Sequence, residues 1–245
     1  MLTPAWKPLR YHEQQTALWR TKARFVAVRA GRGSGKTELA RRRVVRYLAV
    51  KKEHPNPDYF YALPTFAQAK RVAWRPIKEL IPQEWVSKIS ETELTIQTVF
   101  GSTLYVIGMD KPHRFEGEQY DGGVIDESSD QKPGVFDRNF LPALSHRMGW
   151  CWRIGVPKRT GQGAREFRRA FQEWSISSDP TTAAYTWGSD TVLTEEQLAW
   201  ARKHLDQRDF NEQFLGQDEE IGGRVFYAFS PANVSSSVAL NPALI

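Results

Sequence analysis

Eight consecutive residues, Ala30-Gly31-Arg32-Gly33-Ser34-Gly35-Lys36-Thr37, constrain the fold of this chain more than any other feature. They follow a short β-branched run at residues 24–30 and precede a helical pattern at residues 36–51. The glycines let backbone N–H groups turn inward around a phosphate, and the helix presents its positive end there. Lys36 would reach the β- and γ-phosphate oxygens, and Thr37 would ligate Mg²⁺. The segment therefore predicts a Walker A phosphate loop, with Ala30 in the first Gly position.

A dinucleotide site is the nearest rival for a glycine-rich turn between a strand and a helix. Gly31, Gly33 and Gly35 do not give the G-x-G-x-x-G spacing that such a site needs. A side chain at Gly33 or Gly35 would also obstruct the phosphate cradle. We therefore assign the whole segment from Gly31 to Thr37 to nucleotide binding, and we expect the nucleotide to be ATP.

A second motif ends in two acids, at Gly122-Gly123-Val124-Ile125-Asp126-Glu127. Many strands end in an exposed Asp, but the phosphate loop some 90 residues earlier favours a Walker B strand. Asp126 would then hold Mg²⁺, and Glu127 would polarise the attacking water from a strand adjacent to that of the loop. A Glu directly after the Mg²⁺ ligand favours hydrolysis over phosphate transfer to a small molecule.

Hydrolysis also needs a cation that neutralises the negative charge spreading over the γ-phosphoryl oxygens in the transition state. Arg32 in the loop and Arg114 upstream of the Walker B strand are the candidates. Each could equally be a surface arginine, so both stay open as catalytic residues.

The elements around these motifs alternate between strand and helix. Strands are predicted at 58–63, 122–126 and 151–156, a hairpin at 94–98 and 103–107, and helices at 65–80, 164–174 and 195–205. In the helix after the loop, Ala40, Val44 and Leu48 should face a sheet, with the arginines at 41, 42, 43 and 46 mainly outside. The order predicts an α/β P-loop NTPase of the hydrolytic, RecA-like type, with a mainly parallel central sheet and helices on both faces.

Composition excludes several other classes. No apolar run approaches the ~20 residues that cross a bilayer, and the N-terminus lacks a secretory signal, so we expect a cytoplasmic protein without membrane contact. Cys151 is the only cysteine and the five histidines lack ligand spacing, so no structural metal is expected. Residues 1–80 hold 18 Lys and Arg against five Asp and Glu, an asymmetry that suits a polyanion-facing surface or simply solvated helix faces.

The order of segments resembles that of the large terminases of tailed phages, the ATPases that drive double-stranded DNA into procapsids. Tyr11-His12-Glu13-Gln14-Gln15 resembles the adenine-recognition segment of that family, with Gln15 in the Gln position. Glu13 replaces the usual Pro, which leaves Gln14 as the alternative. Arg32 is similar to the arginine common in the family's Walker A loop, and Leu63–Lys70 with Trp74 resembles the segment after the second strand.

Three further segments carry the likeness toward the end of the chain. Arg114-Phe115-Glu116-Gly117 resembles the approach to Walker B, which implies that Arg114 is an arginine finger offered to a neighbouring subunit. Ile154-Gly155-Val156-Pro157 stands at the coupling motif, where Val156 replaces the usual Ser or Thr. Residues 205–216 and 223–226 resemble the stretch that closes the ATPase region.

The resemblance implies Mg²⁺-dependent ATP hydrolysis that powers translocation of viral double-stranded DNA in the cytoplasm of an infected bacterium. The implied partners are this DNA, the portal protein, the small terminase subunit and further copies in a homo-oligomeric ring on the procapsid. Complete terminases continue into an RNase H-like nuclease that needs several carboxylates, whereas no Asp or Glu follows Glu220. We therefore expect an ATPase domain at 1–225, its terminal segments forming a small lid, and the start of a linker at 226–245, without nuclease activity.

Two rival functions share part of this pattern. A helicase-like or remodelling ATPase would have the same Walker pair, but it normally carries a second RecA-like domain for which 245 residues leave no room. A DNA-binding module with a degenerate phosphate loop is the other rival. The intact set of Lys36, Thr37, Asp126 and Glu127 argues against it.

Overall fold

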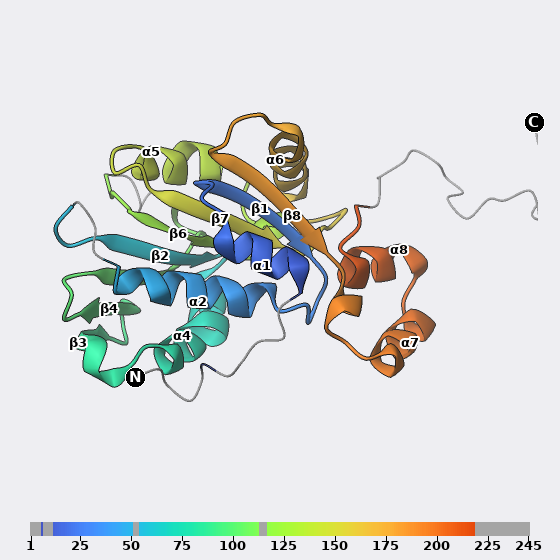
Figure 1. Cartoon of the computed structure of the whole chain (residues 1–245), viewed down its shortest axis with the longest axis horizontal. Coiled ribbons are helices and arrows are strands. Elements are labelled where there is room, and N and C mark those ends of the chain that lie inside the picture. The colour runs from blue at the N-terminus through green and yellow to red at the C-terminus, as the bar shows by residue number, and fades with distance from the viewer. Residues whose placement is uncertain (1–5, 7–11, 51–53, 113–116, 219–245) are drawn as a thin grey trace, which may run out of the picture.

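The structure, a computed structural model, describes Trp6 and residues 12–50, 54–112 and 117–218 (Figure 1). Within these residues the centre is an eight-stranded sheet in the order β3-β4-β5-β2-β6-β7-β1-β8. The strands are β1 (Phe25–Ala30), β2 (Asp58–Leu63), β3 (Val86–Ser90), β4 (Thr95–Thr98), β5 (Thr103–Gly108), β6 (Gly122–Ile125), β7 (Trp150–Gly155) and β8 (Thr182–Trp187).

Most of this sheet is parallel. Each neighbouring pair from β5 to β8 in this order runs parallel, whereas β4 pairs antiparallel with both β3 and β5. β2 is buried along nearly its whole length, as a strand covered on both faces should be. The predicted sheet is therefore confirmed, with an antiparallel edge.

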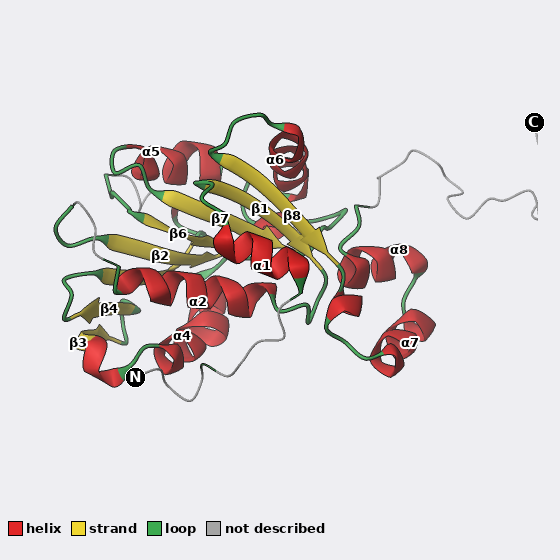
Figure 2. Ribbon diagram, viewed as in Figure 1, coloured by secondary structure: helices red, strands yellow, loops and turns green. Residues whose placement is uncertain are grey.

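Helices cover both faces of the sheet (Figures 1 and 2). The α-helices are α1 (Glu13–Arg20), α2 (Lys36–Leu48), α3 (Phe66–Gln68), α4 (Arg75–Leu80), α5 (Leu141–Ser145), α6 (Ala164–Ile176), α7 (Glu195–His204) and α8 (Gln207–Phe210). Shorter turns of 3₁₀-helix are η2 (Gln83–Trp85), η4 (Ser128–Asp130) and η6 (Ser189–Thr191). π-Helical stretches are η1 (Ala69–Trp74), η5 (Phe136–Phe140) and η7 (Asn211–Leu215).

Two apolar layers hold these helices to the sheet. On one face, α2 buries Leu39, Val44 and Leu48 against side chains of β1, β2 and β7. On the other face, α5 and η5 pack on Phe60 and Ile125 of the sheet. α7 and α8 lie beyond the edge of the sheet, next to the end of β8 (Figure 1).

Local sequence explains several helix boundaries. Thr65 and Thr194 each form a capping box, accepting a hydrogen bond from the backbone N–H of Gln68 and Gln197 respectively. The predicted helices at 65–80 and 195–205 begin at these caps, although the first contains the π-helical stretch η1. β3, β8 and α1 were not predicted.

The prediction for the arginines of α2 is wrong at two positions. Arg46 is exposed, but Arg42 and Arg43 are buried. The Arg43 guanidinium donates to the Trp19 carbonyl oxygen at 3.0 Å and lies 4.9 Å from the ring centre of Trp152. Arg42 pairs with Glu38 at 2.8 Å. Aromatic faces and fixed acceptors replace water around both cations, which is why burial is tolerated.

None of the helices in the described part of the chain is long and apolar enough to cross a membrane. The expected linker at 226–245, the segment 223–226 and Arg114 lie outside the described residues.

Candidate active site

The parallel strands bring the predicted motifs to one edge of the sheet. β1 ends at Ala30 before the phosphate loop, and β6 ends at Ile125 before the two acids. β7 lies between them, so the acids do not come from a strand adjacent to β1, as the sequence had led us to expect. The acids reach the loop because the carboxyl ends of β1, β7 and β6 lie side by side.

The phosphate loop has the backbone shape that its glycines predict. Gly33 and Gly35 have positive φ angles of 72° and 83°, in the region that favours glycine. Lys36 is buried, and its Nζ donates to the Gly31 carbonyl oxygen at 3.1 Å. The Ser34 hydroxyl is also buried and has no hydrogen-bond partner among the described residues. The loop thus gathers a cation and a free hydroxyl around a turn of backbone.

The electrostatics of Lys36 tie it to the acidic strand end. Burial lowers the pKa of Lys36, while the charges of Asp126 and Glu127 raise it. Arg32 and Lys158 lower the pKa of Lys36 further, since they add positive charge nearby. Two carboxylates and three cations therefore share one partly water-excluded edge of the sheet.

Segments remote in sequence hold the loop in place. The Ser34 carbonyl oxygen accepts from Gln15 Nε2 at 2.9 Å and from Trp187 Nε1 at 3.1 Å. The Arg32 backbone N–H donates to the Gln213 carbonyl oxygen at 2.6 Å, and Ser189 Oγ donates to the Arg32 carbonyl oxygen at 2.6 Å. The loop is thus fixed by α1, by the end of β8, by η6 and by η7.

Gly31 shows how close this C-terminal segment lies. A Cβ at Gly31 would stand 2.2 Å from both the Phe214 carbonyl oxygen and Ser189 Oγ. Neither neighbour is the far end of a flexible chain, so a side chain at position 31 would push η6 and η7 away from the loop.

Asp126 is fixed through both carboxylate oxygens. It is 2% exposed, its Oδ2 accepts from the Tyr61 hydroxyl at 2.6 Å, and its Oδ1 accepts from the Glu127 backbone N–H at 2.9 Å. A carboxylate has about four acceptor positions, so each oxygen keeps one for a further partner. Carboxylate oxygens with free acceptor positions fit Mg²⁺, and the half-buried Thr37 hydroxyl is of the same hard oxygen type.

Glu127 adopts a backbone conformation that is uncommon outside glycine, with φ 53° and ψ 45°. Burial raises its pKa, and the charge of Asp126 adds to this, while Lys158 and Lys36 lower it. Glu127 Oε2 is buried and accepts no hydrogen bond from a described residue. A carboxylate with a free oxygen at this edge can accept a proton from water.

The coupling segment contacts the Walker B loop through a different residue than the resemblance implied. Val156 has no hydroxyl, but its carbonyl oxygen accepts from Ser129 Oγ at 2.6 Å. Ser129 is the second residue of η4, which begins directly after Glu127. The connection between the two loops therefore uses a side chain of the acidic loop and the backbone of the coupling segment.

Not every predicted site residue points into this site. Gln15 lies against Ser34, but its role in adenine selection stays a prediction. The exposed Arg32 side chain is hydrogen-bonded through Nε to Gln213 Oε1, toward the C-terminal helices. The catalytic roles of Arg32 and Arg114 stay predictions.

Sequence reasoning missed four residues that shape the site. Tyr61, Lys158, Ser189 and Gln213 contact Asp126, Glu127 or the loop backbone. Lys158 could have been found, because it follows the predicted strand at 151–156 and so had to lie at the same sheet edge. Ser189 and Gln213 carry no such signal, since their positions depend on how the C-terminal segment folds back.

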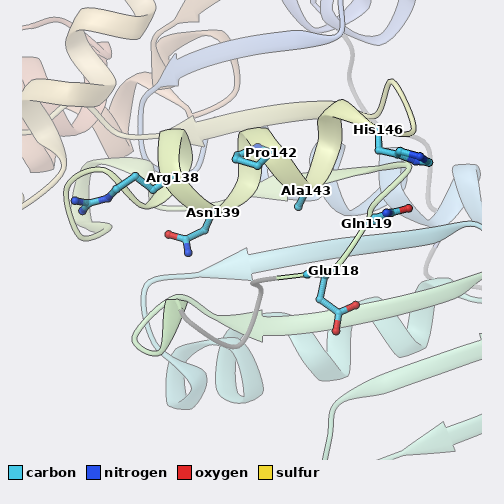
Figure 3. Close-up of a pocket in the computed structure, with 8 residues that line it drawn as sticks. Glu118, Gln119, Arg138, Asn139, Pro142, Ala143 and His146 are labelled. Atoms are coloured by element: carbon cyan, nitrogen blue, oxygen red, sulfur yellow. The ribbon is translucent and has the colours of Figure 1, made fainter.

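A separate shallow pocket of about 310 Å³ lies beside α5 (Figure 3). Glu118 and Gln119 lie on one side of it, and Arg138, Asn139 and His146 on the other. It contains no residue of the phosphate loop or of the acidic strand end, so it is distinct from the candidate active site.

Sequence comparison assigns the segment that carries both motifs. Residues 28–136 match the family described as terminase large subunit, T4likevirus-type, N-terminal. This segment is therefore similar to the N-terminal part of terminase large subunits. No protein of curated function shows a significant sequence match to it.

Solved structures show the same fold over most of this chain. The large terminase ATPase domain of Thermus phage P74-26 is 20% identical with a TM-score of 0.70, over 84% of this chain and 92% of that one. The HK97 bacteriophage large terminase is 13% identical with a TM-score of 0.67, over 86% of this chain and 51% of that one. The large terminase of a thermophilic bacteriophage is 12% identical with a TM-score of 0.71, over 91% and 57%. The predicted P-loop NTPase fold is thus confirmed.

Proposed function

We propose that this chain hydrolyses ATP and that hydrolysis powers the packaging of double-stranded viral DNA into a procapsid. The observation that carries the proposal is the meeting of Lys36, Asp126 and Glu127 at one edge of the sheet. A buried lysine in a glycine-rich turn binds phosphate, and two successive acids after β6, at the same edge of the sheet, suit Mg²⁺ binding and water activation.

Each residue then has one task. The backbone N–H groups from Gly31 to Gly35 and the Lys36 ammonium bind the triphosphate. Asp126 and Thr37 would hold Mg²⁺, which supplies charge neutralisation at the phosphate oxygens. Glu127 accepts the proton of the attacking water through its free Oε2. Gln15 contributes to adenine recognition, which its position beside the loop allows.

The comparisons support the wider assignment. The large terminase of the thermophilic bacteriophage has been solved with ADP and with ATP-gamma-S, which supports nucleotide binding by this chain. By analogy, double-stranded DNA, a portal protein, a small terminase subunit and further copies of this chain in a ring are its partners. We assign the ATPase unit to residues 1–225, with its N- and C-terminal segments forming a small lid.

Phosphate release from ATP tests the proposal most directly. The purified chain should release phosphate from ATP in the presence of Mg²⁺ and stop when EDTA removes the metal. Linear double-stranded DNA should become protected from nuclease when the chain is added with procapsids, portal and the remaining motor components. A chain that binds ATP without hydrolysing it, with or without these partners, would refute the ATPase assignment.

Arg114 gives the ring proposal its own test. If Arg114 completes the site of a neighbouring copy, specific ATPase activity should rise with protein concentration. Arg114→Ala should remove this rise, and mixing it with Glu127→Gln protein should restore part of the activity, because each copy supplies what the other lacks. Activity that is independent of concentration, with normal turnover by Arg114→Ala, would rule out the finger.

A further inference from the structure

Lys158 is a cation at the hydrolytic end of the site. It follows β7 and Pro157, and its Nζ lies 3.9 Å from Glu127 Oε2. It also forms a close ion pair with Asp130, which stands three residues after Glu127 in η4. The ammonium thus lies between the proposed water-activating carboxylate and a second acid on the same turn.

The position of Lys158 is fixed from several directions. Its side chain is 19% exposed. The next residue, Arg159, pairs with Asp209 of α8 at 2.5 Å and with Glu212 of η7 at 3.7 Å. Before it, the Val156 carbonyl oxygen accepts the bond from Ser129. The backbone at Lys158 is therefore held on one side by the loop after β6 and on the other by the C-terminal helices.

The two contacts of Lys158 differ in kind. A separation of 3.9 Å from Glu127 is too long for a hydrogen bond, so the ammonium attracts the carboxylate without occupying its lone pairs. Asp130, in direct contact, keeps the ammonium from closing that gap. Glu127 Oε2 consequently stays free to accept from water, while a charge beside it limits how the carboxylate can turn.

We infer that Lys158 is a positioning residue for hydrolysis, held by Asp130 at a distance from which it orients Glu127 without blocking it. This inference rests on the proposed ATPase function. The competing explanation is an ion pair that only ties the loop after β7 to the loop after β6. That explanation predicts lower stability when Lys158 is replaced, but no selective change in turnover.

Steady-state ATP hydrolysis and binding of a fluorescent ATP analogue separate these explanations. Lys158→Met should lower kcat about 10- to 100-fold, since small misplacements of a catalytic group have effects of this order. Nucleotide affinity should stay within about threefold, because the phosphate loop is untouched. Lys158→Arg should recover most of the lost rate. Lys132→Met is the matched control, since among the described residues the Lys132 ammonium donates to the Asp110 carbonyl oxygen, at 2.8 Å, and pairs with no acid.

Asp130→Asn tests the restraint itself. Without the Asp130 charge, the ammonium should move onto Glu127 and occupy its free oxygen, so kcat should fall about tenfold with nucleotide affinity unchanged. In the Lys158→Met background the same change should have less than a twofold effect, because no ammonium remains to be released. If the two residues acted independently, the reductions in kcat of the two single variants would multiply in the double variant.

The outcomes distinguish this inference from the function on which it rests. If the unmodified chain hydrolyses ATP and Lys158→Met keeps kcat within twofold of it, the positioning role is wrong and the ATPase stands. If Lys158→Met does not fold, unchanged kcat in Asp130→Asn overturns the role in the same way. If the unmodified chain does not hydrolyse ATP at all, both fall together.

Discussion

The phosphate loop and the loops after β6 and β7 that face it are held in place by different interactions. The phosphate loop is held by neutral hydrogen bonds from Gln15, Trp187, Ser189 and to Gln213, nearly all of which use its backbone. The loops after β6 and β7 are held largely by charge, through the contacts of Lys158 with Glu127 and Asp130. The first region depends on the shape of the backbone, and the second on the balance of nearby charges.

This difference teaches which changes each region should tolerate. Because the phosphate loop contributes backbone atoms to these bonds, they should survive substitution of most loop side chains. They should not survive a change in the path of the loop or the loss of a donor such as Gln15. Charge contacts survive small displacements, since Coulomb attraction varies slowly with distance, but not the loss of one partner. Substitutions of charged residues in the loops after β6 and β7 should therefore alter the rate of ATP hydrolysis. Substitutions that add bulk to the phosphate loop should alter stability and nucleotide affinity.

Glu127→Gln should give the largest effect. The amide cannot accept the proton of water as a carboxylate does, so turnover should fall about a thousandfold. Nucleotide affinity should change little, since the loop around Lys36 keeps its shape. Single-turnover phosphate release and analogue binding measure the two quantities. Turnover at the rate of the unmodified chain would remove Glu127 from its role.

Lys36→Ala should come next, and it should act on binding. Loss of the buried ammonium removes the charge-assisted bonds to the triphosphate, so nucleotide affinity should fall about a hundredfold. Lys203→Ala, in the last turn of α7, is the control and should bind normally. Equal affinity of Lys36→Ala and the unmodified chain would mean that the triphosphate does not enter this loop.

Gly31→Ala should destabilise the phosphate-loop region without changing any charge. The added methyl group would meet the Phe214 carbonyl oxygen and Ser189 Oγ, so the free energy of unfolding should fall by about 1–3 kcal/mol. Urea unfolding followed by tryptophan fluorescence measures this change. An unchanged midpoint would show that the C-terminal segment does not pack on the loop as described.

Ser129→Ala should have the smallest effect. It tests whether a hydrogen bond between uncharged groups also helps to hold the loops after β6 and β7 together. Loss of the hydrogen bond to the Val156 carbonyl oxygen should lower the free energy of unfolding by about 1 kcal/mol. Ser145→Ala is the matched control, since the exposed Ser145 hydroxyl donates to the Leu141 carbonyl oxygen at 2.7 Å within a helix. If Ser129→Ala were as stable as Ser145→Ala, the loops after β6 and β7 would be held together by their ion pairs and not by this hydrogen bond.

The sequence predicted most of the elements that carry a local signal. Glycine spacing defined the loop after β1, apolar runs defined β2 and β6, and the caps Thr65 and Thr194 defined two helices. β3 and β8 were missed because β3 lies at the sheet edge with most of its side chains exposed, and β8 is only partly buried. Neither strand has the apolar pattern on which strand prediction relies.

What the sequence could not predict concerns neighbours in space. Strand order cannot be read from periodicity, so the insertion of β7 between β1 and β6 was unexpected. The burial of Arg43 depends on Trp150 and Trp152, which are more than 100 residues away in the chain. The contacts of Lys158 followed from the same strand order, since β7 ends beside β6.

The carbonyl oxygen of Ser34 has a practical consequence for dissecting this molecule. One of its two donors lies in α1, before β1, and the other ends β8, so two segments about 170 residues apart in the chain converge on a single atom. A fragment trimmed to residues 28–136 would retain every Walker residue yet lose both donors. Such a fragment would carry the signature of a nucleotide site without the scaffold that shapes it.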